Sequence, residues 1–159
     1  MSKTLIAYFS ASGVTARLAQ TLESATGGGL YEIKPGTPYT GADLNWNDKQ
    51  SRSSVEMKDR AARPAVAVPV ENVAQYDYVF VGFPIWWYEA PRIVQTFLES
   101  YDFSGKTVIP FATSGGSGMG KTAAILQKSC PAAKVLPGIR MSGSASLNEV
   151  SSWVKSLGL

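Results

Sequence analysis

Residues 4–15 read TLIAYFSASGVT, and this stretch decides the fold prediction. Residues 4–9 form a short continuous apolar run, which is typical of a strand buried on both faces of a parallel sheet. Small hydroxyl residues and one glycine follow, and residues 14–24 then repeat apolar side chains with helical spacing. A buried strand that passes through a tight polar loop into an amphipathic helix predicts the first unit of an α/β protein.

The same alternation continues along the chain. It predicts a parallel sheet covered by helices on both faces. The chain has 159 residues and contains no repeat and no linker-like segment, so we expect one domain over residues 1–159. Pro110 lies inside an expected strand, where proline cannot donate a ladder hydrogen bond. We expect further strands at 30–34, 78–83, 107–112 and within 134–141, an extended piece at 64–69, and helices within 46–61 and at 90–100, 120–129 and 146–157.

Composition excludes several kinds of chemistry. The chain has no histidine and one cysteine, Cys130, so histidine bases, Ser-His or Cys-His catalysis and Cys/His zinc sites are excluded. We interpret Cys130 as a small buried apolar residue, and the lack of disulfide partners indicates a cytoplasmic protein. The net charge of +3 comes from dispersed basic residues, so we do not expect nucleic-acid binding. No apolar run reaches about 18 residues, so we do not expect a membrane span.

The loop FSASGVT, residues 9–15, has the composition of an anion-binding loop. Ser10, Ser12 and Thr15 offer hydroxyl donors, and the N–H groups at a helix N-terminus favour negative charge. The loop has no lysine or arginine, which suits a monophosphate better than a triphosphate. An ordinary capped helix start would show the same pattern, and this alternative stays open.

Two later loops also follow expected strands, at the sheet edge where ligands bind in parallel α/β folds. The loop GFPIWWYEAP, residues 82–91, carries adjacent tryptophans and a tyrosine. Exposed tryptophans are costly unless they stack on something, so a flat aromatic ligand is expected; packing of one ring onto the core is the alternative. The loop ATSGGSGMG, residues 112–120, has four glycines and suits close approach to a planar polar ring or to a phosphate.

Residues 115–122, GGSGMGKT, fit the pattern G-x-x-x-x-G-K-[ST] of phosphate loops in triphosphatases. Such enzymes also need an acidic residue at a strand end to hold magnesium. The strand at 78–83 ends without one, and Asp77 and Asp102 precede their strands. We therefore disfavour a P-loop triphosphatase and interpret Lys121 and Thr122 as residues of a helix start.

The three loops, taken in this order, resemble the flavodoxin-like family over nearly the whole chain. FSASGVT matches the loop that binds the phosphate of FMN in that family, and PIWW at 84–87 with FLESYDFSGKTVIPFATSGGSG at 97–118 looks like a short-chain subgroup of FMN-dependent oxidoreductases. The resemblance implies a three-layer α/β/α sandwich with a five-stranded parallel sheet of order 2-1-3-4-5. It implies that phosphate is held by Ser10, Ser12, Gly13, Val14 and Thr15, and that the ring is framed by Pro84, Ile85, Trp86, Trp87, Ser114, Gly115, Gly116, Ser117 and Gly118.

Two departures from electron-carrier flavodoxins bear on function. Those carriers are usually acidic, whereas this chain is basic, and they carry a glycine near the flavin N5, whereas residues 84–90 contain none. We therefore expect an oxidoreductase that passes electrons through FMN from a reduced nicotinamide or a redox protein to a small acceptor such as a quinone, as a monomer or homodimer. A one-electron carrier and a non-redox regulatory or scaffolding module are the alternatives.

No side chain is predicted to be catalytic, and no metal site is predicted. The irregular residues 36–60, with Tyr39 and Trp46, are expected to form a wall that faces the substrate. A solvated connector is the alternative for this segment.

Overall fold

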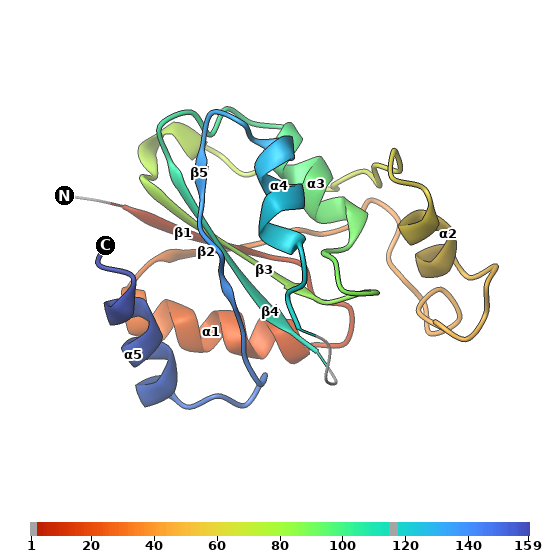
Figure 1. Cartoon of the computed structure of the whole chain (residues 1–159), viewed down its shortest axis with the longest axis horizontal. Coiled ribbons are helices and arrows are strands. Elements are labelled where there is room, and N and C mark those ends of the chain that lie inside the picture. The colour runs from red at the N-terminus through yellow and green to blue at the C-terminus, as the bar shows by residue number, and fades with distance from the viewer. Residues whose placement is uncertain (1–2, 115–117) are drawn as a thin grey trace.

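A computed structural model describes residues 3–114 and 118–159 of the chain. Its centre is a parallel sheet in the order β2-β1-β3-β4-β5, with β6 also paired to β4 (Figure 1). The predicted strand order is confirmed. The strands are β1 Thr4–Tyr8, β2 Gly29–Glu32, β3 Tyr78–Pro84, β4 Thr107–Thr113, β5 Lys134–Val135 and β6 Ile139–Arg140.

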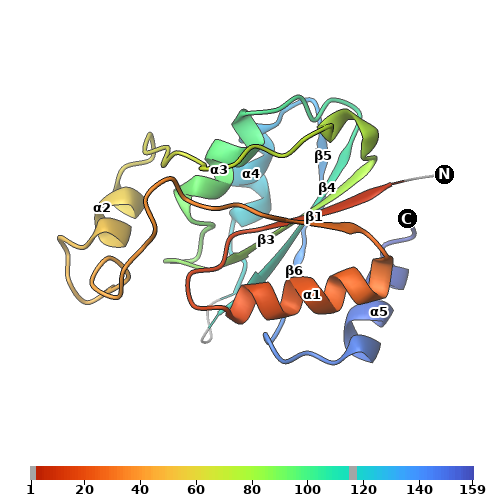
Figure 2. The same cartoon turned by 180° about the vertical axis from the view of Figure 1, so that it is seen from behind.

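Helices cover both faces of this sheet and give three layers. The first and last helices, α1 (Val14–Thr26) and α5 (Leu147–Ser156), pack together on one face (Figure 2). On the other face α3 (Arg92–Glu99) packs beside α4 (Thr122–Ser129). A short 3₁₀ turn, Val73–Gln75, leads into β3. Because the strands run parallel, the loops that follow the central strands all lie at the same edge of the sheet.

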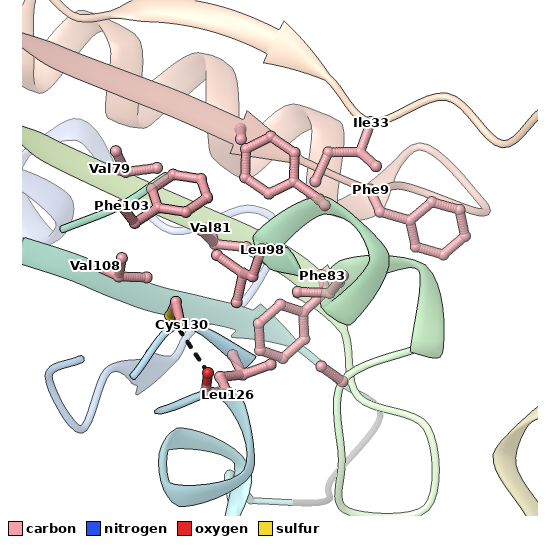
Figure 3. Packing of buried hydrophobic residues seen from close by; sticks show 14 of the residues in the cluster. Phe9, Ile33, Val79, Val81, Phe83, Leu98, Phe103, Val108, Leu126 and Cys130 are labelled. Atoms are coloured by element: carbon pink, nitrogen blue, oxygen red, sulfur yellow. Dashed lines mark hydrogen bonds between the residues drawn. The ribbon is translucent and has the colours of Figure 1, made fainter. Parts of the chain in front are cut away.

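The core divides between the two faces because side chains alternate along each strand. On the α3/α4 face, Val79, Val81 and Phe83 of β3 pack with residues of β4, α3 and α4 (Figure 3). Cys130 belongs to this cluster, as predicted; it is 6% exposed and its Sγ lies 3.4 Å from the Leu126 carbonyl oxygen. Burial raises the pKa of the Cys130 thiol to about 11.

The outer strand next to β4 is broken, and the expected fifth strand is therefore two short pieces. β5 pairs with Thr107 and Val108, and β6 pairs with Phe111 and Ala112. The break faces Pro110, which has no N–H to donate across the ladder. Gly138 lies in the break with φ +76, and a Cβ there would come within 2.4 Å of the Pro110 carbonyl oxygen. Proline in β4 is thus accommodated by a glycine kink in its neighbour.

After β2 the chain leaves the sheet and returns, and residues 36–65 are called the excursion below. Its two ends pair antiparallel: Gly36 N–H donates to the Ala65 carbonyl (2.8 Å), and Ala67 N–H donates to the Lys34 carbonyl (2.7 Å). The helix expected within 46–61 is present as α2, Arg52–Lys58, and Ser51 caps it by accepting the Ser54 N–H. The excursion lies beyond the sheet on the side of the strand carboxyl ends (Figure 1).

Candidate functional site

The first loop presents backbone at the N-terminus of α1. Gly13 has φ 92, a left-handed conformation that costs a glycine little, and Ser12, Gly13 and Val14 are exposed. Ser10 Oγ accepts the N–H groups of Gly13 (3.1 Å) and Ala16 (3.2 Å), which fixes the loop against the helix. No carboxylate occurs in this loop. A preorganised, acid-free helix start of this kind fits a phosphate.

Thr15 has a different place from the one its motif suggested. Its side chain is 1% exposed, and its hydroxyl oxygen lies 2.8 Å from that of Thr113, the last residue of β4. The pair connects the first loop to the strand that leads into the third loop. Direct donation from Thr15 to a phosphate stays a prediction, whereas its bond to Thr113 is a contact that the sequence motif does not reveal.

The second loop is a tight turn with unusual residues at its centre. Trp86 and Glu89 exchange both backbone hydrogen bonds (2.9 and 3.1 Å), and the two central residues, Trp87 and Tyr88, have φ 49 and 64. A turn with two left-handed residues normally carries Asn-Gly, so bulky aromatic residues there store strain. Trp87 is 45% exposed and Tyr88 is 63% exposed. The turn therefore displays two aromatic rings at the sheet edge.

The two adjacent tryptophans have different roles. Trp86 packs edge-on against Phe9 (5.7 Å between ring centroids) and Tyr39 (5.5 Å), so it caps the core. Ile85 is half-buried, and its N–H donates to the Thr113 carbonyl (2.9 Å) directly after Pro84 ends β3. Of the two rings, Trp87 is the one free to stack on a ligand.

The third loop is described only at its two ends. Ser114 is half-buried and Gly118 is exposed, whereas the predicted ring contacts Gly115, Gly116 and Ser117 lie outside the described residues. At the exit, Thr122 is buried and its hydroxyl faces the carbonyl oxygens of Met119 and Tyr88, the latter at 3.2 Å. Thr122 thus belongs to a helix start that is bonded to the second loop, as predicted, and it is not poised as a magnesium ligand.

A buried arginine joins the second loop to the excursion. Arg92 is 1% exposed and donates to the Glu89 carboxylate (2.9 Å) and the Gln95 side-chain oxygen (3.3 Å). It also donates to the backbone carbonyls of Met57 (2.7 Å) and Asp59 (3.3 Å) at the end of α2. Arg92 is not among the residues predicted from the sequence, although a lone arginine among apolar neighbours in APRIV is a signal for it.

Tyr39 lies on the part of the excursion that packs against the loops at the sheet edge. Its hydroxyl donates to the Glu56 carboxylate, and the Arg52 guanidinium lies 3.8 Å from the centre of its ring. Burial, and next the bond to Glu56, raise the pKa of Tyr39 far above the usual value for a phenol. Tyr39 is therefore a neutral donor that packs against Phe9 and Trp86. The excursion therefore packs against the site edge through Tyr39, while most of its residues are exposed, and its role as a substrate-facing wall stays a prediction.

Within residues 3–114 and 118–159, no group of three or more Cys, Asp or Glu residues is arranged to hold a metal ion. In the same part of the chain, no helix has the length and apolar character needed to cross a bilayer.

Comparison with known proteins identifies relatives of the whole chain. Residues 3–157 match the family described as Flavodoxin. A protein from Bacteroides eggerthii that is provisionally named a flavoprotein is 49% identical, with a TM-score of 0.92 and coverage of 100% of this chain and 99% of that one. A similarly named protein from Bacteroides uniformis is also 49% identical, with a TM-score of 0.86 and coverage of 97% and 98%.

A more distant match carries a ligand. A flavoprotein from Lactobacillus acidophilus, solved in complex with FMN, is 22% identical, with a TM-score of 0.70 and coverage of 97% of this chain and 99% of that one. At this identity the likeness shows the shared fold. No curated protein is detectably similar to the chain in sequence.

Proposed function

The chain belongs to the flavodoxin family, and we propose that it is an FMN-dependent oxidoreductase that passes electrons through FMN to a small acceptor such as a quinone. Family membership and the FMN complex of the Lactobacillus relative support FMN as the cofactor. The donor in this proposal is a reduced nicotinamide or a redox protein. We place the reaction in the cytoplasm, because a single buried cysteine suits a reducing compartment.

The observation that carries the proposal is the meeting of two features at one edge of the sheet. The exposed start of α1 offers hydroxyl and backbone donors to a phosphate, and the Trp86–Glu89 turn displays aromatic rings to a flat group. The Thr15–Thr113 bond and the Ile85–Thr113 bond hold both loops to the end of β4. A phosphate and a planar ring system are the two ends of FMN, so the donor set fits this cofactor.

The chain's own residues bind, orient and shield the cofactor. Ser10, Ser12 and Gly13 would hold the phosphate, and Trp87 would lie against the ring. Bound FMN would supply two-electron transfer, and two electrons together with two protons convert a quinone to a hydroquinone. No side chain is assigned a catalytic role.

The second loop favours an oxidoreductase over a one-electron carrier. Carriers of this family are expected to use a glycine peptide that turns during reduction, and residues 84–90 contain no glycine. Here the left-handed positions are filled by Trp87 and Tyr88, and bulky residues restrict such a peptide rotation. The net charge of +3 also disfavours docking on basic redox partners.

The first test is an absorbance spectrum of the purified protein before and after incubation with FMN and desalting. We expect a retained flavin spectrum and, with a reduced nicotinamide and a quinone, steady turnover that depends on both. A protein that stays colourless after FMN loading would refute the proposal. Retained FMN without turnover would instead support a carrier or a non-redox module, and stepwise anaerobic reduction would separate these two.

A further inference from the structure

A hollow lies between the Trp86–Glu89 turn and the excursion. It has a volume of about 540 Å³, and its lining includes Trp46, Met57 and Trp87 together with Lys49 and Lys58. Its volume lies within the range of about 300–1,000 Å³ that is typical of small-molecule sites. The cofactor loops at residues 10–15 are not part of its lining.

The aromatic lining is poorly explained by packing alone. Trp46 is 69% exposed and Trp87 is 45% exposed, although both rings border the same hollow. Trp86 and Trp153 differ from these two, because each packs against another aromatic ring of the protein. Two exposed tryptophans from distant segments that line one concavity together with a methionine are typical of a surface that binds an aromatic group.

The charge around the hollow is positive. Neither Lys49 nor Lys58 has an ion-pair partner within the described part of the chain. Glu56 pairs with Arg52, and Glu89 pairs with two arginines. Asp48 and Asp59, the chain neighbours of the two lysines, accept backbone N–H groups from Gln50 and Ala61. Residues 46–63 carry five basic and three acidic side chains. The lysine ammonium groups are therefore available to a ligand.

We propose that this hollow binds the electron acceptor, and that the acceptor is a planar aromatic compound with an anionic substituent, such as a carboxylate or sulfonate. The ring stacks on Trp46 and Trp87, and the anion lies at Lys49 and Lys58. The inference rests on the proposed function, because Trp87 also belongs to the turn that frames the flavin ring. The hollow and the predicted ring contacts share this turn, so a ligand in the hollow would lie close to the residues that would hold the flavin.

The test measures binding in the FMN-loaded protein, using naphthalene-2-sulfonate as an anionic probe and 2-naphthalenemethanol as its neutral counterpart. Neither probe accepts electrons readily, so binding is read without turnover. The indole N–H signals of the four tryptophans report the site by ¹⁵N NMR, after assignment with Trp→Phe variants. Trp153 serves as the internal reference, because it packs against Phe80 on the opposite face of the sheet.

We expect the sulfonate to shift the Trp46 and Trp87 signals and to leave Trp153 unchanged. The double variant Lys49→Gln/Lys58→Gln should weaken sulfonate binding roughly tenfold, because it removes two exposed charge contacts to the anion. It should leave binding of the alcohol unchanged. The control variant Lys128→Gln/Lys155→Gln removes two exposed lysines outside the hollow and should bind the sulfonate like the parent.

Two outcomes would overturn the inference: no shift of Trp46 and Trp87 with the sulfonate, or equal affinity of the parent for the sulfonate and the alcohol. Flavin absorbance of the same sample reports the proposed function separately. Loss of FMN would refute that function, whereas retained FMN without sulfonate binding would refute only the acceptor site.

Discussion

Replacing Arg92 by methionine tests whether the site edge is held by one buried residue. Methionine keeps an unbranched apolar chain and removes the guanidinium. The change deletes the hydrogen bonds to the Glu89 carboxylate (2.9 Å) and the Gln95 side chain. The backbone carbonyl oxygens of Met57 and Asp59 also lose the hydrogen bonds that Arg92 donates to them. The excursion then loses its buried connection to α3 and keeps only the more exposed Arg63–Glu99 pair among the ion pairs to that helix.

The size of the effect follows from the surroundings of Glu89. Removing one partner of a buried pair typically costs about 3–5 kcal/mol. Here the Glu89 side chain is 18% exposed and keeps a second partner, Arg60, at 3.3 Å, so part of its charge stays solvated and paired. We therefore expect Arg92→Met to lower the free energy of unfolding by about 3 kcal/mol. For a chain of this size that corresponds to a Tm lower by roughly 6–12 °C.

The assay is urea unfolding followed by tryptophan fluorescence and circular dichroism, with limited proteolysis of residues 36–65 as a local probe. The matched control is Arg63→Gln, which breaks an arginine–carboxylate pair with Glu99 whose side chains are 31% and 39% exposed. Such a surface pair contributes about 1 kcal/mol or less. Equal losses for Arg92→Met and Arg63→Gln, or unchanged cleavage of the excursion, would refute the reasoning.

Three further predictions concern single residues of the site and core. Thr15→Val removes the hydroxyl bonded to Thr113 and should cost about 1 kcal/mol of stability and weaken FMN binding; an FMN titration by fluorescence that gives the parent affinity would contradict the first-loop assignment. Tyr88→Gly relieves a left-handed backbone and should stabilise the protein by about 1 kcal/mol while lowering FMN affinity; a lower Tm would contradict this. Because the pKa of Cys130 rises to about 11, native protein at pH 8 should be alkylated far more slowly than protein in urea, and stability should fall as the pH rises above about 9; equal alkylation rates would contradict the burial.

The sheet was predictable from sequence because its signals are local. Apolar runs of five to seven residues mark β1, β3 and β4, and parallel strands buried on both faces need such runs. Pro110 indicated an irregularity in the sheet, because proline cannot donate a ladder hydrogen bond. Only the structure shows that the kink lies in the neighbouring strand, at Gly138. The strand order came from the family resemblance and not from these patterns.

The site edge was less predictable because it depends on contacts between distant segments. The sequence gives Trp86 and Trp87 identical side chains in adjacent positions, yet one is packed and the other exposed. The difference arises because Tyr39, which the excursion brings back to the sheet, packs against Trp86. The excursion is in turn bonded to Arg92, whose carbonyl partners Asp59 and Met57 are 33 and 35 residues away in sequence. No local pattern encodes such a set of contacts.

The turn that displays the aromatic rings is held from three sides by contacts that no motif predicts. Left-handed conformations at Trp87 and Tyr88 cost about 1–3 kcal/mol each and persist only where the surroundings fix them. Here Arg92 holds the Glu89 carboxylate at one end, Thr122 faces the Tyr88 carbonyl, and Trp86 is packed in the core. The strain is thus borne by buried contacts from α3, α4 and the excursion. In the proposed function, a turn fixed in this way would orient the flat flavin ring, and it has no glycine peptide that could rotate during one-electron reduction. This is the physical reason to prefer two-electron chemistry for this chain.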